Sequence, residues 1–432
     1  MTKAFLHLQE GFCFLSKFVI KIKNISVKNI LLSILFVGII FQSCNTVHNK
    51  NEIKPYLVVL SLDGFRWDYP DKANTPTLDS LAKAGVKAKS LKPCFPSKTF
   101  PNHYSIATGL YPDHHGLVLN RFHATDLGKN YSISDTKTVT DGEFYGGKPI
   151  WNVAEEQGIK TATLFWVGAS ADINNERPSH WSLYDEELSK QDRIDSVFHW
   201  LSMPEETRPH LIMGYYHEPD ETGHNFGPES NETLDLIEEL DSFLADFFTQ
   251  MRKLPNYDEI NFIITSDHGM AELSPDKVIF LDNIIDTADL EFIDGGNPVY
   301  NLKVKEGKLE KVYTELSEYG NNLLVWKHNE VTEELHYGTN IRTHDITIVS
   351  DSGWSIYWSW FNGKSLGTHG FKNTCKDMHA IFYAAGPDFK ISYNQPTFNN
   401  IDIYPLAGKI LNLKLPKVDG KIENVKDMLK TK

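Results

Sequence analysis

The sequence predicts an α/β fold with a mostly parallel central sheet, helices covering both of its faces, and a small β-rich inserted lobe. Apolar runs such as YLVVLSL at 56–62 are continuous rather than alternating, which is typical of parallel strands buried on both faces. Helical stretches alternate with these runs. Between about 280 and 365 the segments become alternating and turn-bounded, and 432 residues suffice for a large core with such an insertion.

The elements of the core are predicted in chain order. The first strand ends in Asp63-Gly64, and the next helix, 75–85, has Pro76 near its start and Gly85 at its stop. HYSIATGLYP at 103–112 predicts a second helix. Later strands are predicted within 160–168, 209–217, 260–269 and 379–386, and later helices near 149–157, 190–202 and 231–252.

The inserted lobe is predicted from three short segments. NPVYNLKV at 297–304, NLLVWKH at 322–328 and WSIYWSW at 354–360 carry turn signals and alternation. The aromatic residues of the last segment are interpreted as strand packing rather than as a ligand platform. GTHGF at 367–371 returns the chain to the core.

The N-terminal segment differs in kind from the rest. Lys17, Lys21, Lys23 and Lys28 precede the apolar run ILLSILFVGIIF at 30–41, which is too short for a comfortable membrane span. Cys44 stands where this run stops, as in a bacterial lipoprotein signal. Residues 1–43 are therefore predicted to be a lipoprotein-type signal peptide, and Cys44 the lipidated residue.

Residues 44–54 are predicted to be a polar tether, and 55–430 a catalytic domain with its insertion at about 280–365. This places the protein in the bacterial cell envelope, exported and held at the membrane by its lipid. Cys94 and Cys375 are left over, and a disulfide between them stays open. The net charge of −14 argues against a stable nucleic-acid partner, because binding a phosphate backbone requires clustered Lys and Arg.

Polar side chains follow the predicted strands at the points where the strands end. Chemistry in an open α/β sheet lies beyond the carboxyl ends of its strands, so these side chains are expected to converge. They are three aspartates and three histidines: Asp63, Asp220, His224, Asp267, His268 and His369. Each alone has an ordinary explanation, such as a helix cap. Together they predict a site for divalent metals, and six ligands suit two ions about 4 Å apart, an arrangement used for displacement at phosphorus.

Five ordered motifs resemble a known family. They are SLDGFR at 61–66, PSKTFPNHYSIATGLYPDHHG at 96–116, EPDETGH at 218–224, SDHGM at 266–270 and GTHG at 367–370. They look like the nucleotide pyrophosphatase/phosphodiesterase family of the alkaline phosphatase superfamily. The resemblance covers about 55–410. It implies that Thr99, in K-T-F-P, is the nucleophile.

The resemblance also implies two Zn²⁺ ions. One set of ligands comprises Asp63, Thr99, Asp267 and His268, and the other comprises Asp220, His224 and His369. These sets use the six residues already found at the strand ends. Asn120 is implied to donate a hydrogen bond to a non-bridging phosphoryl oxygen, a contact that typically contributes a few kcal/mol. His103, His114 and His115 are interpreted as packing or supporting residues, and Ser97 as part of the turn before the helix.

The substrate pocket is implied by the same resemblance. In nucleotide-hydrolysing members two aromatic rings sandwich the base, and here these would be Phe100 and Tyr184. Ordinary packing is the alternative for Tyr184, because Trp166-Val167-Gly168 departs from the family's W-P-G motif. Lys98 either complements substrate charge or is solvated.

The resulting hypothesis is zinc-dependent hydrolysis of nucleotide phosphodiester or pyrophosphate bonds. A covalent phosphothreonine forms on Thr99, and hydrolysis releases a nucleoside 5′-monophosphate. The same fold acting on choline or glycerol phosphodiesters, phosphonates or phosphomonoesters is the alternative. A catalytically dead binding protein is disfavoured, because all the implied residues are present.

A sulfatase is a third interpretation, because CFPSK resembles the sulfatase signature C-x-P-x-R around a modified cysteine. Lys98 replaces its arginine. Moreover, Thr108-Gly109 lies nine residues after Thr99 but fourteen after Cys94. In sulfatases the corresponding Thr-Gly pair lies about nine residues after the modified cysteine, so this spacing puts Thr99, not Cys94, at the position of the nucleophile. Cys94 is therefore interpreted as structural.

Overall fold

The computed structural model describes residues 55–360, 363 and 365–431. The predicted signal peptide, the tether and Cys44 lie outside these residues. Among the described residues, no helix has the length and apolar character needed to cross a membrane.

The core is an eight-stranded mixed sheet with the strand order β19-β2-β18-β9-β1-β8-β6-β7. The strands from β9 to β7 are parallel to one another, whereas β18 runs antiparallel to both of its neighbours. The strands are β1 (Tyr56–Leu62), β2 (Val86–Ala88), β6 (Thr161–Leu164), β7 (His180–Ser182), β8 (Leu211–Tyr216), β9 (Ile260–Thr265), β18 (Phe382–Ala385) and β19 (Tyr393–Gln395).

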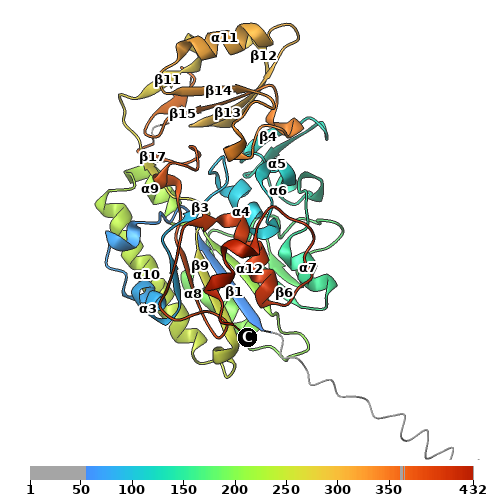
Figure 1. Ribbon diagram of the computed structural model, residues 1–432, viewed down its shortest axis with the longest axis vertical. Coiled ribbons are helices and arrows are strands. Elements are labelled where there is room, and N and C mark those ends of the chain that lie inside the picture. The colour runs from blue at the N-terminus through green and yellow to red at the C-terminus, as the bar shows by residue number, and fades with distance from the viewer. Residues whose placement is uncertain (1–54, 361–362, 364, 432) are drawn as a thin grey trace, which may run out of the picture. The chain divides into compact units, whose positions relative to one another are not determined.

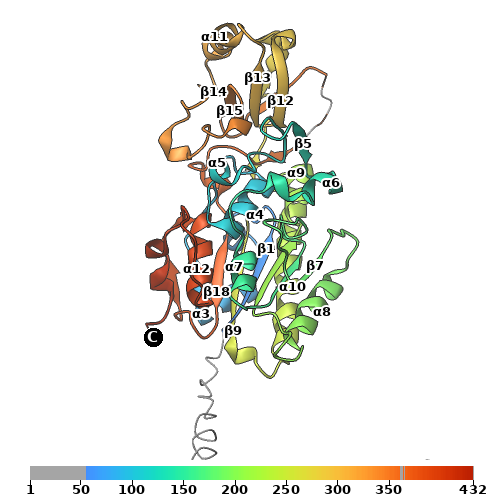
Figure 2. The same ribbon diagram turned by 90° about the vertical axis from the view of Figure 1, so that its right-hand side faces the viewer.

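Both faces of this sheet are buried, as the continuous apolar strands predict. Successive residues of β1 point to opposite faces, so Leu57 and Val59 join one hydrophobic cluster, and Val58 and Leu60 join another. The first cluster packs beneath α4 (Thr99–Thr108), α7 (Ile150–Glu156) and α12 (Ile403–Ile410). The second packs beneath α3 (Pro76–Ala84), α8 (Lys190–Leu201) and α10 (Asn231–Met251). Figures 1 and 2 show these helices on the two sides of the sheet.

A β-rich lobe lies beyond one end of the sheet (Figure 1). Its four-stranded antiparallel sheet has the order β12-β13-β15-β14, with a hydrophobic cluster of its own. The sequence did not predict the lobe's helix, α11. The lobe elements are β11 (Val278–Phe280), β12 (Leu290–Gly296), β13 (Val299–Val304), α11 (Leu309–Tyr319), β14 (Leu323–Lys327), β15 (Ile346–Ser350) and β16 (Ser355–Tyr357).

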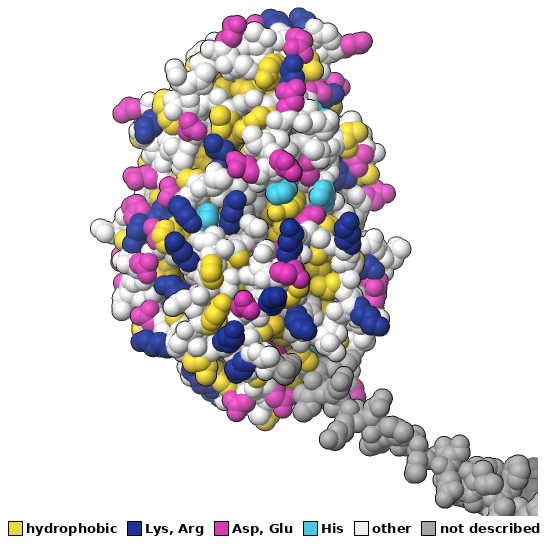
Figure 3. Space-filling view, in the orientation of Figure 1, with side chains coloured by type: hydrophobic (Ala, Val, Ile, Leu, Met, Phe, Trp, Pro, Cys, Tyr) yellow, Lys and Arg dark blue, Asp and Glu magenta, His cyan; other side chains and the backbone are white. Residues whose placement is uncertain are grey.

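Several short elements lie outside these two sheets. They are α5 (Pro112–His115), α6 (Thr136–Val139), α9 (Asp220–Phe226) and the strand pairs β3 (Leu91–Lys92) with β20 (Phe398–Asn399), β4 (Arg121–Ala124) with β5 (Lys129–Ser132), and β10 (Ala271–Glu272) with β17 (Gly367–Thr368). Figure 3 shows one face of the molecule, on which basic and acidic side chains are interspersed.

One boundary differs from the prediction in a way that matters for the site. The predicted helix 103–112 begins four residues earlier, at Thr99, and ends at Thr108, where Gly109 adopts a φ of 68°. Pro101 occupies the third position of this helix, where the missing N–H has no intrahelical partner to lose. The helix therefore starts at the predicted nucleophile.

Candidate active site

The first group of candidate ligands forms at the carboxyl ends of two adjacent strands. Asp63 directly follows β1, and Asp267 and His268 follow β9. One ligand atom from each of the three residues lies within 4.8 Å of the others. His268 Nε2 is 3.3 Å from Asp63 Oδ1 and 3.1 Å from Asp267 Oδ2, and all three side chains are buried.

The second group forms on α9 and after β17. Asp220 opens α9, and His224 lies four residues later, so both side chains share one face of the helix. His369 follows β17 and completes the group, again with the ligand atoms within 4.8 Å of one another. Asp220 lies with Oδ2 3.5 Å from His224 Nε2 and Oδ1 3.6 Å from His369 Nε2.

The two groups adjoin. The rings of His268 and His369 stack with their centroids 3.6 Å apart and an interplanar angle of 14°. The structure thus brings together all six residues that the sequence places at strand ends, and it groups them in two sets of three that match the two implied ligand sets apart from Thr99.

Backbone carbonyls fix the orientation of the three imidazoles. Nδ1 of His268 lies 2.9 Å from Gly269 O, Nδ1 of His224 lies 2.7 Å from Gly367 O, and Nδ1 of His369 lies 2.7 Å from Ser97 O. A carbonyl oxygen only accepts, so Nδ1 carries the proton in each ring. Nε2 is left unprotonated and directed at the carboxylates, the arrangement that metal-ligating histidines adopt.

The carboxylates provide the test of whether a metal fits. Among the described residues, no hydrogen-bond donor serves Asp63 Oδ1, Asp220 Oδ1 or Asp267 Oδ2, although all three atoms are buried. Burial raises the pKa of all three carboxyls, that of Asp267 to about 8, and neighbouring carboxylates add to the effect at Asp63 and Asp267. Burial also lowers the pKa of His268 and His369. A divalent cation in each group would supply the missing partner, and carboxylate with neutral imidazole is the ligand chemistry of such ions.

Thr99 lies beside the first group. Its Oγ1 is 3.2 Å from His268 Nε2, and the side chain is 7% exposed, so it is accessible from the site but largely enclosed. His103, one turn along α4, supports this position: its Nδ1 is 3.0 Å from Thr99 O and 3.3 Å from Asp267 Oδ2, while its Nε2 is 2.9 Å from Ser61 Oγ. His103 therefore ties the helix of the predicted nucleophile to Ser61 of β1, two residues before Asp63.

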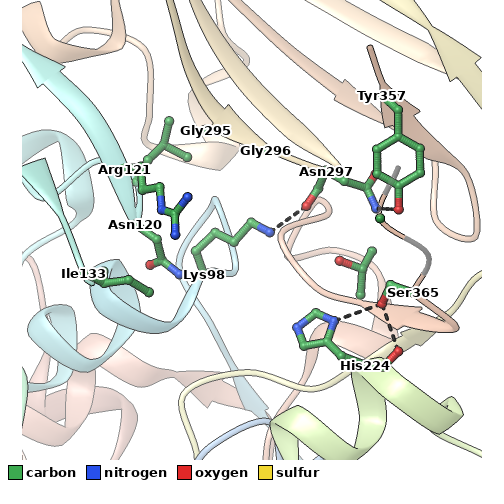
Figure 4. Close-up of a pocket in the computed structure, with 13 residues that line it drawn as sticks. Lys98, Asn120, Arg121, Ile133, His224, Gly295, Gly296, Asn297, Tyr357 and Ser365 are labelled. Carbon is green, nitrogen blue, oxygen red and sulfur yellow. Dashed lines mark hydrogen bonds between the residues drawn. The ribbon is translucent and has the colours of Figure 1, made fainter. Parts of the chain in front are cut away.

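Asn120 is oriented so that its side-chain nitrogen, Nδ2, can donate a hydrogen bond into the site. Its Oδ1 accepts a hydrogen bond from the backbone N–H of Phe100 at 3.0 Å, which directs Nδ2 the other way, and Asn120 lines a cavity together with Lys98 (Figure 4). The Phe100 ring is half-buried and packs edge-on against Tyr131, at 6.4 Å between centroids. Phe100 thus links the helix of the predicted nucleophile to Asn120, the predicted hydrogen-bond donor to a phosphoryl oxygen.

Tyr184 is 51% exposed and contacts Phe165 and Tyr215, with ring centroids 5.4 and 6.1 Å away. No ring contact joins Tyr184 to Phe100 among the described residues, so the base-sandwich role of this pair stays a prediction. Lys98, immediately before Thr99, extends to the lobe and donates a hydrogen bond to Asn297 O at 2.8 Å. Burial lowers the pKa of Lys98 to about 8.

The other reactive side chains within 93–116 make contacts away from the candidate ligands. Cys94 and Cys375 are both free thiols, and burial raises the pKa of Cys94 to about 12, which makes its thiol a poor nucleophile. His115 is buried against Ser105, and His114 pairs with Asp419 at the surface. Ser97 Oγ donates to Phe371 O, as expected for a turn residue.

Two residues near the site were missed from the sequence. Tyr215, inside β8, donates a hydrogen bond from its phenol to Asp63 Oδ2 at 2.7 Å. Arg121, the first residue of β4, lines a cavity beside Asn120 and Lys98. Neither belongs to a motif, and neither follows a predicted strand, so no local signal distinguished them.

Comparisons with known proteins bear on this site. Residues 57–372 match the family described as type I phosphodiesterase/nucleotide pyrophosphatase. Human ectonucleotide pyrophosphatase/phosphodiesterase family member 5 is 34% identical over 388 residues, which cover 90% of this chain and 80% of that protein. The Xenopus laevis bis(5′-adenosyl)-triphosphatase enpp4 is 33% identical, with coverages of 89% and 84%.

The fold of this chain is also similar to that of a solved structure. An inactive variant of murine ectonucleotide pyrophosphatase/phosphodiesterase 5 in complex with AMP has a TM-score of 0.84 and 34% identity. The similarity covers 87% of this chain and 100% of that one.

Proposed function

The chain belongs to the type I phosphodiesterase/nucleotide pyrophosphatase family, and from that premise we propose that it hydrolyses phosphodiester and pyrophosphate bonds of nucleotides with Thr99 as the nucleophile. One observation carries the proposal. The Thr99 hydroxyl lies 3.2 Å from His268 Nε2, beside two adjoining groups of buried carboxylates and oriented imidazoles. This is the geometry that displacement at phosphorus requires.

The residues fit a pair of divalent ions, which we take to be Zn²⁺. The first ion would be held by Asp63, Thr99, Asp267 and His268, and the second by Asp220, His224 and His369. When bound, such ions lower the pKa of hydroxyl groups and draw negative charge from phosphoryl oxygens.

The chain's own residues position the reaction. Thr99 Oγ1 attacks the phosphorus after its proton has passed to water, and the bond to the leaving oxygen breaks. Asn120 Nδ2 stabilises the charge that develops on a non-bridging oxygen. His103 connects α4 to Ser61 of β1 through its Nε2. Water then cleaves the bond between phosphorus and Thr99, restores the threonine proton and releases a nucleoside 5′-monophosphate.

The nucleotide is proposed from the relatives and from the aromatic residues. One relative is named a bis(5′-adenosyl)-triphosphatase, and a similar structure contains AMP. Phe100 and the exposed ring of Tyr184 would stack on the base.

A substrate and metal comparison tests the proposal. Purified protein beginning near residue 50 is assayed with the p-nitrophenyl ester of thymidine 5′-monophosphate and with p-nitrophenyl phosphate, before and after chelation and Zn²⁺ return. We expect a preference for the diester that disappears with chelator and returns with Zn²⁺. A preference for the monoester would contradict the proposal.

A substitution tests the nucleophile. Thr99→Ala is expected to abolish turnover while the Zn²⁺ content measured by elemental analysis stays close to that of the wild type. Thr207→Ala, at an exposed threonine in the loop that leads into β8, is the matched control. It should retain both the turnover and the Zn²⁺ content of the wild type. Appreciable turnover by Thr99→Ala would refute the assignment.

We also propose that residues 1–43 form a lipoprotein signal peptide and that Cys44 carries the lipid, which places the enzyme in the bacterial cell envelope. Support comes from the lysines before the apolar run and from the cysteine at its end. Mass spectrometry of the mature N-terminus should show lipid on Cys44, and Cys44→Ser should release the protein from the membrane fraction. An unmodified Cys44 in membrane-bound protein would contradict this.

A further inference from the structure

The loop that carries Tyr184 has few hydrogen bonds of its own. It joins β7, which ends at Ser182, to α8, which begins at Lys190, and Tyr184 is 51% exposed in it. Among the described residues, no hydrogen bond joins the main chain of 184–188 to another main-chain group. The cavity in Figure 4 is lined by none of the described residues of this loop. The position of the Tyr184 ring therefore depends on side chains that reach the loop from other elements.

Arg193, in the first turn of α8, is the side chain that binds this loop. Its Nε donates a hydrogen bond to Leu188 O at 2.9 Å, and its Nη2 donates to Asp185 O and Glu186 O at 3.3 and 3.4 Å. The guanidinium group presents its N–H donors in a planar fork, so one side chain can bind three carbonyls at once. Arg193 thus supplies hydrogen bonds that a helix or a strand would otherwise provide.

The same guanidinium group lies against the rings behind Tyr184. Its central carbon is 5.0 Å from the ring centroid of Phe165 and 5.0 Å from that of Tyr216. The Phe165 ring in turn packs edge-on against the Tyr184 ring, at 5.4 Å between centroids. Arg193 therefore supports Tyr184 twice, through the main chain of its loop and through the ring packed against it.

The burial of Arg193 is not offset by a carboxylate. Arg193 is 4% exposed and forms no ion pair within the described part of the chain, whereas Arg208 and Arg342 both pair with carboxylates. Taking a charged group out of water is unfavourable, and burial accordingly lowers the pKa of Arg193. Three of its four hydrogen bonds go to the loop of Tyr184, so the geometry of that loop is what this buried charge determines.

We propose that Arg193 is a positioning residue for the nucleoside: it holds the 183–188 loop so that the Tyr184 ring is in place before the base binds. The inference rests on the proposed function and assigns part of the substrate affinity to a side chain that acts through Tyr184. A ring that is held in advance removes the entropy cost of ordering the loop on binding. Loss of Arg193 should therefore raise KM for nucleoside esters and leave kcat unchanged.

Two esters with the same leaving group test the inference. The p-nitrophenyl ester of thymidine 5′-monophosphate carries a nucleoside, and methyl p-nitrophenyl phosphate carries a methyl group in its place. Arg193→Met removes the charge and the donors but keeps an unbranched stem, and it should raise KM for the thymidine ester about fivefold. KM for the methyl ester and both kcat values should equal those of the wild type. Arg193→Lys keeps the charge against the two rings, so its KM should lie between those of the wild type and Arg193→Met.

A control and a double variant separate positioning from general damage. Arg208 also lies over a tyrosine ring, that of Tyr56, and donates to the Met203 carbonyl, but at the amino end of the sheet. Arg208→Met is therefore the matched control and should leave both KM values unchanged. Because Arg193 acts through Tyr184, Arg193→Met should add no further rise of KM in the Tyr184→Ala background.

Proteolysis gives a measurement that does not depend on activity. The loop contains Glu186 and Glu187, both exposed, so a glutamate-specific protease should cut the folded Arg193→Met variant there faster than the wild type. Cleavage at Glu306, exposed between β13 and α11, should be equal in the two proteins, with the sites identified by mass spectrometry. Equal cleavage at Glu186 and Glu187 would refute the hold of Arg193 on the loop.

The outcomes distinguish the inference from the proposed function. If the wild type hydrolyses the thymidine ester and Arg193→Met leaves its KM unchanged, the inference is overturned and the proposed function stands. Equal rises of KM for the two esters would also overturn the inference, because the effect would not depend on the nucleoside. If the wild type hydrolyses neither ester, the proposed function fails and the inference falls with it.

Discussion

Replacing Tyr215 with Phe removes one oxygen from the site and leaves the ring in place. That oxygen donates to Asp63 Oδ2 at 2.7 Å, and Asp63 is 2% exposed. Because Asp63 is a proposed metal ligand, loss of this hydrogen bond should lower the affinity for Zn²⁺ more than it lowers the free energy of unfolding. The Tyr215 phenol is the described side-chain donor to this carboxylate, so the other oxygen, Oδ1, is left to face the metal.

The expected magnitude follows from this contact. A hydrogen bond to a charged group contributes about 1.5–3 kcal/mol, and 1.4 kcal/mol corresponds to a factor of ten, so the affinity should fall by about ten- to hundredfold. Substitutions of residues that support metal ligands typically have effects of this size.

The assay is a Zn²⁺ titration of the chelated enzyme against a competing chelator of known affinity, followed by activity and by bound metal. Tyr131→Phe is the matched control, because it removes a buried phenol that bonds instead to the Tyr145 hydroxyl at 2.8 Å. The control should bind Zn²⁺ like the wild type. Equal Zn²⁺ affinity of Tyr215→Phe and the wild type would refute the reasoning.

Three further predictions concern other parts of the molecule. Asn120→Ala should lower kcat by about a hundredfold with unchanged Zn²⁺ content, as measured by steady-state kinetics and elemental analysis, because it removes a donor to the transition state. Tyr184→Ala should raise KM about tenfold for a thymidine diester but not for methyl p-nitrophenyl phosphate, which has a methyl group in place of the nucleoside and so nothing to stack there. Burial lowers the pKa of His115 to about 3, so below about pH 6.5 the unfolded chain takes up a proton that the fold excludes, and the free energy of unfolding should fall toward pH 4. Denaturant titrations should show a weaker fall in His115→Asn.

The two groups of candidate ligands could be anticipated from the sequence because their positions depend on local features. Asp63 and Asp267 come directly after continuous apolar runs, and parallel strands bring their carboxyl ends to one edge of a sheet. His224 follows Asp220 by one helical turn. No long-range information was needed beyond the alternation of strands and helices.

Residues that act across the fold gave no such signal. Tyr215 points at Asp63 because β1 and β8 are adjacent, with Ser61 opposite Tyr215 in register. Arg121 lines a cavity whose other side is formed by the lobe. Helix α11 was not predicted, because the segments on both sides of it have the pattern of strands. Its buried residues, Val312 and Leu316, are four residues apart, which is the spacing of one helical face.

The central claim is that Thr99 forms a covalent bond to phosphorus, and an acid-quenched reaction tests it most directly. The wild-type enzyme is mixed with a thymidine diester, quenched within one turnover, digested and analysed by mass spectrometry. The account predicts a thymidylyl group on Thr99, absent from Thr99→Ala. A nucleotidyl group on another residue, or none on an enzyme that turns over normally, would contradict it.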